Sequence, residues 1–134
     1  NGLDSINNQL TKIQFKKKNF LPQVDTVFFS KDTFDVTNTP MDILIVMAAV
    51  SDPDGQNDIS LVESVFGVSP FPMYDDGNTT EHGDTLFADG IYSRVFSVDS
   101  TNTAGKRTLA FRAIDKSGDT SNTIEKSFYI KSSK

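Results

Sequence analysis

The sequence predicts an all-β fold, an immunoglobulin-like antiparallel β-sandwich of seven to eight strands with a short N-terminal extension. Three observations support this prediction. From Pro22 onward, short runs rich in Val, Ile, Phe and Thr alternate with clusters of Gly, Asp, Asn, Ser and Pro, at the spacing of an antiparallel sandwich. No long helical periodicity interrupts these runs. The chain has 11 Phe and no Trp, so Phe and the branched aliphatic residues must fill the core.

Length and composition fit one packed domain. A chain of 134 residues can bury roughly two-thirds of its unfolded surface around a single core. Hydrophobic residues make up 37% and charged residues 23% of the chain, which is typical of a globular protein. We divide it into an N-terminal extension or linker over residues 1–21 and an Ig-like sandwich domain over residues 22–134.

The extension differs in pattern from the rest of the chain. Leu3, Ile6, Leu10 and Ile13 recur at helical spacing, ahead of a run of lysines at residues 16–18. This pattern indicates a short helix or a linker, and a linker to a preceding domain explains it equally well. Because the chain begins at Asn1 without Met, we expect a mature or trimmed fragment.

Eight segments have strand character. We expect strands at Val24–Phe29, Phe34–Thr37, Asp42–Val50, Ile59–Phe66, Phe71–Tyr74, Gly90–Val98, Lys106–Ile114 and Thr123–Ile130.

Residue periodicity predicts how three of these strands are placed. The run 43–47 is apolar throughout, which favours a central strand covered on both faces. Leu109, Phe111 and Ala113 alternate with Thr108, Ala110 and Arg112, so one face of that strand should point inward and the other toward water. The last strand should likewise bury Ile124, Phe128 and Ile130.

Composition excludes several kinds of chemistry. The absence of cysteine excludes disulfides, thiolate metal sites and a cysteine nucleophile. A net charge of −5 argues against nucleic acid as a partner, since phosphate contacts need a basic face. No apolar run reaches the length of a membrane span, so we expect no membrane-spanning segment.

Acidic residues concentrate in three of the predicted loops. Because each antiparallel connection reverses the chain, alternate loops should lie at the same end of the sandwich. These three loops contain ten of the eighteen acidic residues: Asp52, Asp54, Asp58, Asp75, Asp76, Glu81, Asp84, Asp89, Asp115 and Asp119. We therefore expect the ten to gather at one end.

Calcium is one explanation of this clustering, because Ca²⁺ takes about six to eight oxygen ligands and would offset the repulsion between carboxylates. The candidate metal ligands are Asp52, Asp54 and Asp58 around Gly55, and Asp75, Asp76, Asp84 and Asp89 in the longer loop. The other explanation is that the Asp-Gly pairs only form turns, since Asp bonds its own backbone and Gly accepts positive φ. The sequence leaves both explanations open.

The loop sequences resemble a known family. Five segments are similar to turn motifs of bacterial extracellular Ig-like or fibronectin-III-like modules: Val50-Ser51-Asp52-Pro53-Asp54-Gly55, Met73-Tyr74-Asp75-Asp76-Gly77, Gly83-Asp84, Ala88-Asp89-Gly90-Ile91-Tyr92-Ser93 and Ala113-Ile114-Asp115-Lys116-Ser117-Gly118-Asp119-Thr120-Ser121. The resemblance covers residues 22–132. It implies an extracellular, cell-surface or periplasmic location, in a surface protein, a lipoprotein or an appendage of a secreted enzyme.

A noncatalytic extracellular module for adhesion, spacing or presentation, stabilised by calcium, is the function that the sequence favours. Its partner would be a protein or a cell surface, including a second copy of itself. An enzyme has little support, because the sole histidine, His82, lies in a polar loop without an evident nucleophile. One alternative is a self-assembling fibre subunit that uses residues 1–20. Another is a carbohydrate-binding accessory module of a secreted enzyme, whose aromatic residues would be Tyr74, Tyr92 and Tyr129.

Overall fold

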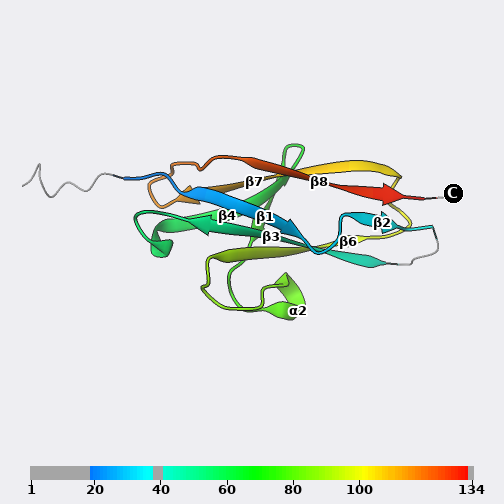
Figure 1. The fold of residues 1–134 in the computed structure, drawn as a ribbon, viewed down its shortest axis with the longest axis horizontal. Coiled ribbons are helices and arrows are strands. Elements are labelled where there is room, and N and C mark those ends of the chain that lie inside the picture. Colours follow the sequence, from blue (N-terminus) through cyan, green and yellow to red (C-terminus); the bar gives the residue numbers. More distant parts are fainter. Residues whose placement is uncertain (1–18, 38–40, 133–134) are drawn as a thin grey trace, which may run out of the picture.

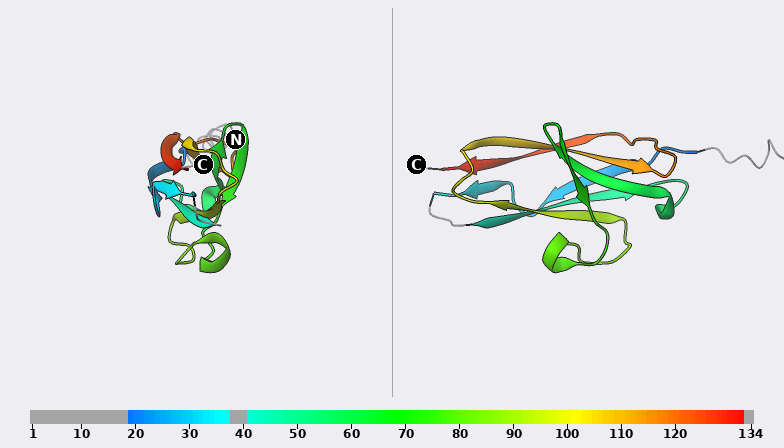
Figure 2. Two further views of the ribbon diagram at one scale, coloured as in Figure 1. Left: turned by 90° about the vertical axis from the view of Figure 1, so that its right-hand side faces the viewer. Right: turned by 180° about the vertical axis from the view of Figure 1, so that it is seen from behind.

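Two β-sheets packed face to face form the molecule in a computed structural model that describes residues 19–37 and 41–132 (Figures 1 and 2), which confirms the predicted fold class. The strands are β1 (Gln23–Phe29), β2 (Thr33–Asp35), β3 (Asp42–Ser51), β4 (Ile59–Phe66), β5 (Ser69–Met73), β6 (Ile91–Val98), β7 (Gly105–Asp115) and β8 (Ile124–Lys131). The first and last residues of all eight strands agree with the predicted ones to within two residues. The predicted character of residues 1–18 lies outside the described residues.

The strands are divided unequally between the sheets. The smaller sheet has the order β1-β3-β6 and the larger one the order β2-β8-β7-β4-β5. All neighbours pair antiparallel except β2, which pairs parallel with β8. The exception arises because the chain crosses from one sheet to the other between residues 29 and 33 without reversing direction, so that β1 and β2 point the same way (Figure 1).

Alternation along the strands builds the core. Leu109, Phe111 and Ala113 of β7 are buried between the sheets, as predicted, and Phe128 and Ile130 of β8 join them. A group of phenylalanine rings fills the centre, with ring centroids 6.0 Å apart for Phe29 and Phe111 and 6.1 Å apart for Phe29 and Phe128. Each fully buried Phe contributes about 1.5–3 kcal/mol, which applies to Phe34, Phe111 and Phe128. Other described phenylalanines are exposed: Phe20, Phe28, Phe66 and Phe87.

The outer face of β3 is less covered than the sequence predicted. The strand is central in its sheet, as expected, and Leu44, Val46 and Ala48 are buried on its inner face. On its outer face Ile43 is 45% exposed. Only the middle is covered, by the loop that follows the short helix α2 (Thr79–His82): a Cβ placed on Gly83 would lie 2.8 Å from Cγ2 of Ile45. A single turn of helix cannot cover a whole sheet face.

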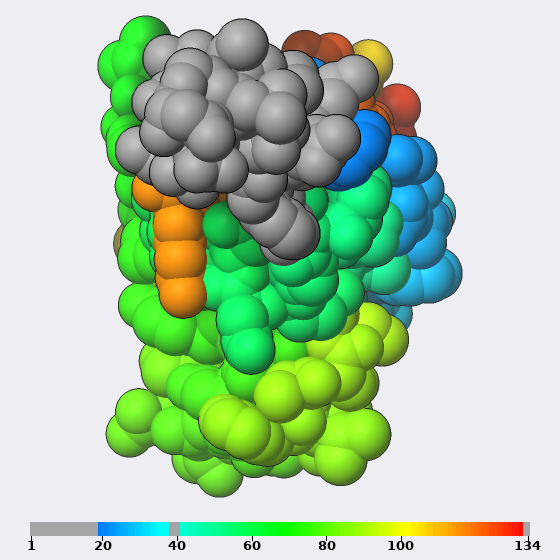
Figure 3. All heavy atoms as spheres, turned by 90° about the vertical axis from the view of Figure 1, so that its left-hand side faces the viewer, coloured from blue at the N-terminus to red at the C-terminus, as the bar shows by residue number. Residues whose placement is uncertain are grey.

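Three loops meet at one end of the sandwich, as the alternation of loops predicted. Ala49 near the end of β3 pairs with Ile91 at the start of β6, and Asp115 at the end of β7 pairs with Ile59 at the start of β4. The β3–β4, β5–β6 and β7–β8 loops therefore share this end, and Figure 3 views the molecule from that side. No helix in the described ranges is long and apolar enough to span a membrane.

Candidate metal centre at the loop end

The acidic residues of this end form two groups. One contains Asp52, Asp54 and Asp58, and the other contains Asp75, Asp84 and Asp89. Within each group, one carboxylate oxygen from every residue lies within 4.8 Å of the others. Six of the seven predicted metal ligands therefore lie in groups that could hold a cation, and these are two separate groups.

The first group is built on a turn that the sequence predicted. The backbone N–H of Asp54 donates to Oδ1 of Asp52 at 2.8 Å, and Gly55 N–H donates to the carbonyl oxygen of Asp52 at 2.8 Å. Gly55 has a φ of 103°, which other residues rarely adopt, and the 3₁₀ turn η1 (Gln56–Asp58) follows it. The hydrogen bonds within this loop therefore form a turn that does not depend on a bound ion.

Two carboxylate oxygens of this group have no partner. Within the described part of the chain, Oδ2 of Asp52 and Oδ2 of Asp58 are buried without a hydrogen bond, and Asp52 as a whole is only 8% exposed. A buried polar atom without a partner costs free energy, and a charged one costs more. Burial raises the pKa of Asp58, and the negative charges of Asp52, Asp115 and Asp54 raise it further. A divalent cation would relieve both effects.

The segment that leads into β1 closes the group from the side. Phe20 N–H donates to Oδ2 of Asp54 at 2.8 Å. The side-chain amide of Asn19 donates to Oδ2 of Asp115 at 2.9 Å and to Oδ2 of Asp119 at 2.6 Å. A hollow of about 240 Å³ lies here, lined by Asn19, Asp54, Asp58 and Ser117. Sequence reasoning missed Asn19, because no local pattern links it to a residue 96 positions away.

Asp115 has a structural role in the same end. It is 1% exposed, and its Oδ1 accepts the backbone N–H groups of Ser117 and Asp119, both at 2.9 Å. The Asn19 amide and these backbone donors lower the pKa of Asp115. Lys116 N–H donates to the carbonyl oxygen of Asp58 at 2.8 Å, which ties the β7–β8 loop to the β3–β4 loop.

The second group uses its oxygens to hold its own loop. Oδ2 of Asp84, a residue 2% exposed, accepts Gly77 N–H at 2.6 Å. Asp75 accepts Asp89 N–H at 3.2 Å and Gly90 N–H at 2.9 Å, one on each oxygen. Burial raises the pKa of Asp75, an effect that these two backbone bonds oppose. The arrangement anchors the two ends of the 75–90 segment to each other.

Asp76, the seventh predicted ligand, lies outside both groups. Its Oδ2 pairs with Nδ1 of His82 at 2.5 Å, and its Oδ1 accepts Asn78 N–H at 3.0 Å. The pKa of Asp76 is lowered, first by the Asn78 bond and then by His82. The His82 ring stacks on Tyr74 with centroids 3.7 Å apart. The structure thus gives the sole histidine an acidic and an aromatic partner that the sequence did not predict.

Comparison with known proteins identifies the fold. Neither a family model nor a curated protein matches the chain. Among solved structures, the chain is similar to the PKD domain of an M14-like peptidase from Thermoplasmatales archaeon SCGC AB-540-F20, at 14% identity and a TM-score of 0.52, over 84% of this chain and 98% of that one. The PKD-like, immunoglobulin-like sandwich is therefore its fold.

Two further structures match less closely. The PKD1 domain of Vibrio anguillarum Epp has 17% identity and a TM-score of 0.46, over 86% of this chain and 99% of that one. A Niemann-Pick type C2 protein from the Japanese carpenter ant has 12% identity and a TM-score of 0.46, over 85% and 96%.

Proposed function

We propose that the chain is a noncatalytic extracellular module for adhesion, spacing or presentation, and that calcium bound by Asp52, Asp54 and Asp58 stabilises its loop end. One observation carries the calcium proposal: the buried, unpartnered Oδ2 atoms of Asp52 and Asp58 in a group of three converging carboxylates. Oxygen ligands of this kind suit a hard cation. The affinity should be low, on the order of 10⁻⁴ to 10⁻³ M, as in other extracellular modules.

A cation there would join three parts of the chain. The β3–β4 loop supplies the carboxylates, the β7–β8 loop is bonded to Asp58 through Lys116 N–H, and the segment before β1 is bonded to Asp54 through Phe20 N–H. Neutralising the carboxylates would therefore stabilise the loops and the segment that leads into the sandwich together. This is a suitable property for a module that must keep a fixed orientation.

Two observations support a noncatalytic role. His82 pairs with Asp76 and stacks on Tyr74, but no serine or threonine hydroxyl among the described residues is hydrogen-bonded to its ring as a nucleophile would be. The structural neighbour from Thermoplasmatales is a PKD domain within a peptidase, and so a module carried by an enzyme. An accessory role beside another domain is consistent with that neighbour.

The calcium proposal is tested by thermal unfolding in excess EDTA and in 10 mM calcium. An ion that binds only the folded chain stabilises it by RT ln(1 + [L]/Kd), which is about 1.4 to 2.7 kcal/mol for 10- to 100-fold excess over Kd. The melting temperature should rise by several degrees in calcium. Coincident curves in EDTA and calcium would contradict the proposal and leave the carboxylates as turn residues.

Carbohydrate binding is a second candidate, favoured by one pocket. Tyr74 and Tyr92 line it together with Asp75, Gln56 and Asn57, and its volume is about 290 Å³. Aromatic rings beside polar groups are typical of small-molecule sites. Titration with mono- and oligosaccharides should then shift the resonances of Tyr74 and Tyr92, and Tyr92→Ala should abolish binding. Tyr129→Ala is the matched control, because Tyr129 is 48% exposed and does not line this pocket.

The fibre-subunit alternative depends on residues 1–20, most of which lie outside the described residues. It stays a prediction, which deletion of those residues and measurement of oligomer size would test.

A further inference from the structure

A second pocket opens between the two sheets where their edges separate. Near the loop end, the edges of β5 and β6 are joined by a bridge in which Tyr74 and Ser93 exchange backbone hydrogen bonds of 2.8 Å. Beyond this bridge, β5 pairs with β4 in the larger sheet, whereas β6 pairs with β3 in the smaller sheet. The space between them has a volume of about 190 Å³. It is lined by Phe66, Phe71, Phe96, Ser97, Val98, Asn102, Arg107, Leu109, Phe128 and Ile130.

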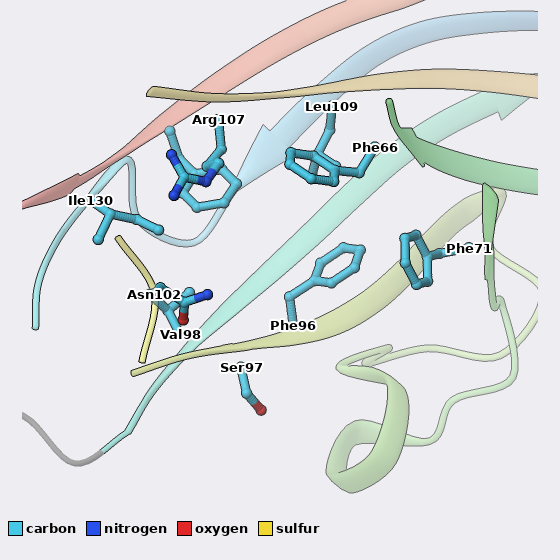
Figure 4. A pocket seen from close by; sticks show the side chains of 10 residues that line it. Phe66, Phe71, Phe96, Ser97, Val98, Asn102, Arg107, Leu109 and Ile130 are labelled. Carbon is cyan, nitrogen blue, oxygen red and sulfur yellow. The ribbon is translucent and has the colours of Figure 1, made fainter. Parts of the chain in front are cut away.

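One part of this pocket is aromatic. Figure 4 shows Phe66, Phe71 and Phe96 on one side, with Leu109 beside Phe66. The rings of Phe71 and Phe96 meet edge to face with centroids 5.4 Å apart, and Phe66 is 46% exposed. An apolar cavity of about 150 Å³ is large enough to bind benzene. The pocket as a whole, at about 190 Å³, is therefore large enough for one aromatic ring or a branched aliphatic group of similar size.

The other part offers hydrogen-bond donors. Figure 4 shows Arg107 and Asn102 on the side of Val98 and Ile130, away from the three phenylalanines. Among the described residues that line the pocket, Arg107 is the only charged one. Bonds from Nη2 to Thr103 at 2.7 and 3.0 Å and from Nη1 to the carbonyl oxygen of Lys106 at 3.3 Å hold its guanidinium, which has five N–H donors in all. Oδ1 of Asn102 accepts Asp99 N–H at 2.9 Å, so the amide nitrogen is the group that Asn102 can present.

We propose that this pocket binds a small carboxylate that carries one ring or a comparable apolar group. The apolar group would lie among Phe66, Phe71 and Phe96, and the carboxylate would accept hydrogen bonds from Arg107. Charge complementarity selects this ligand: the lining has a guanidinium and an amide donor but no carboxylate, in a chain whose net charge is −5. A charge-assisted hydrogen bond from a guanidinium N–H that Thr103 does not use would fix the orientation of the carboxylate. The proposal is independent of calcium, because none of the three carboxylates of the proposed calcium site lines this pocket.

Three probes of the same shape and different charge test the proposal: benzoate, benzamide and benzamidinium. Each is titrated into ¹⁵N- and methyl-labelled protein in EDTA, and shifts are followed at Leu109, Val98 and Ile130. Benzoate should bind at least about fivefold more tightly than benzamide, as one charge-assisted hydrogen bond implies, and benzamidinium should bind most weakly. Equal affinities for the three probes would overturn the proposal. The absence of any shift up to about 20 mM benzoate would overturn it too, because ~0.3 kcal/mol for each of the nine non-hydrogen atoms of benzoate corresponds to a Kd of roughly 10 mM.

Variants test which part of the pocket binds the carboxylate and which binds the ring. Arg107→Gln should remove the preference for benzoate over benzamide while benzamide binding persists, and Arg107→Lys should retain the preference. Phe66→Ala should weaken all three probes alike. Phe87→Ala is the matched control, because Phe87 is an exposed phenylalanine that does not line this pocket. If Arg107→Gln and Arg107→Lys both leave the preference for benzoate unchanged, the carboxylate does not bind at Arg107 and the assignment is wrong.

Discussion

The two acidic groups have the same composition and different hydrogen bonding. In each group, one carboxylate oxygen from each of three aspartates lies within 4.8 Å of the other two. In the 75–90 segment, Asp75 and Asp84 accept backbone N–H groups that hold the loop. In the 52–58 loop, two buried oxygens have no partner among the described residues. A count of carboxylates therefore does not separate a turn from an ion site, whereas the partners of each oxygen do.

The lengths of the two loops explain this difference. The 75–90 segment leaves the sandwich, forms α2 and returns to place Gly83 against Ile45, so its two ends must be bonded to each other. The 52–58 loop only carries the chain from β3 to β4, and the Asp52 turn with η1 accomplishes that. Its remaining carboxylate oxygens are not needed for the turn.

The largest effect should come from the second group. Asp84→Ala removes the acceptor of the Gly77 N–H and leaves that donor unsatisfied, which should lower the free energy of unfolding by about 1–3 kcal/mol. Urea denaturation in EDTA and in calcium should give the same loss. Asp84→Asn, which keeps an acceptor oxygen, is the control and should lose less. A loss seen only in calcium would show that this group binds the ion as well.

The next effect separates the groups by their response to calcium. Asp52→Asn keeps an Oδ1 acceptor for Asp54 N–H but replaces the unpartnered Oδ2 with a neutral group. The increase in melting temperature on adding calcium should therefore disappear, a loss of about 1.4 to 2.7 kcal/mol of stabilisation at 10 mM calcium. Asp84→Asn should retain the calcium response. If Asp52→Asn still responds like the original chain, the first group is not the site.

In EDTA, ionisation of Asp58 and ionisation of Asp115 should change the stability of the fold in opposite directions. The pKa of Asp58 is raised in the folded chain, so its ionised form destabilises the fold above the folded pKa, and this cost is relieved as pH falls toward the unfolded pKa. The pKa of Asp115 is lowered, so its ionised form stabilises the fold above the unfolded pKa, and this contribution is lost as pH falls through the folded pKa.

Substituting each aspartate by Asn in EDTA should reveal these opposite effects on the melting temperature. At pH 7, Asp58→Asn should raise the melting temperature and Asp115→Asn should lower it. Both differences should shrink in acid, the first as pH falls through the folded pKa of Asp58 and the second as pH falls toward the folded pKa of Asp115. A lower melting temperature for Asp58→Asn at pH 7 in EDTA would contradict the account of the unpartnered oxygen.

The smallest effect should come from the segment before β1. Asn19→Ala removes a part-buried hydrogen bond to Asp115 and an exposed one to Asp119, and should lower the melting temperature by about 2 °C. Asn19→Gln is the control that keeps an amide. A loss as large as that of Asp84→Ala would mean that Asn19 supports the fold of the whole loop end.

Local patterns in the sequence were sufficient to predict most of the fold. The alternation at 109, 111 and 113 assigned the faces of β7, because side chains of a strand alternate with a period of two residues. The Asp-Gly pairs marked reversals, and the reversals predicted which loops share an end. These features depend on neighbours along the chain, which are visible in the sequence.

The tertiary structure alone decided which carboxylate serves which purpose. The sequence placed seven candidate metal ligands in two loops, and folding brought six of them together as one group in each loop but paired Asp76 with His82. It also brought Asn19 to Asp115, turned β2 parallel to β8, and assembled Phe66, Phe96 and Arg107 around one pocket. Each depends on distances of a few ångströms between residues far apart along the chain, and strand periodicity does not specify such distances.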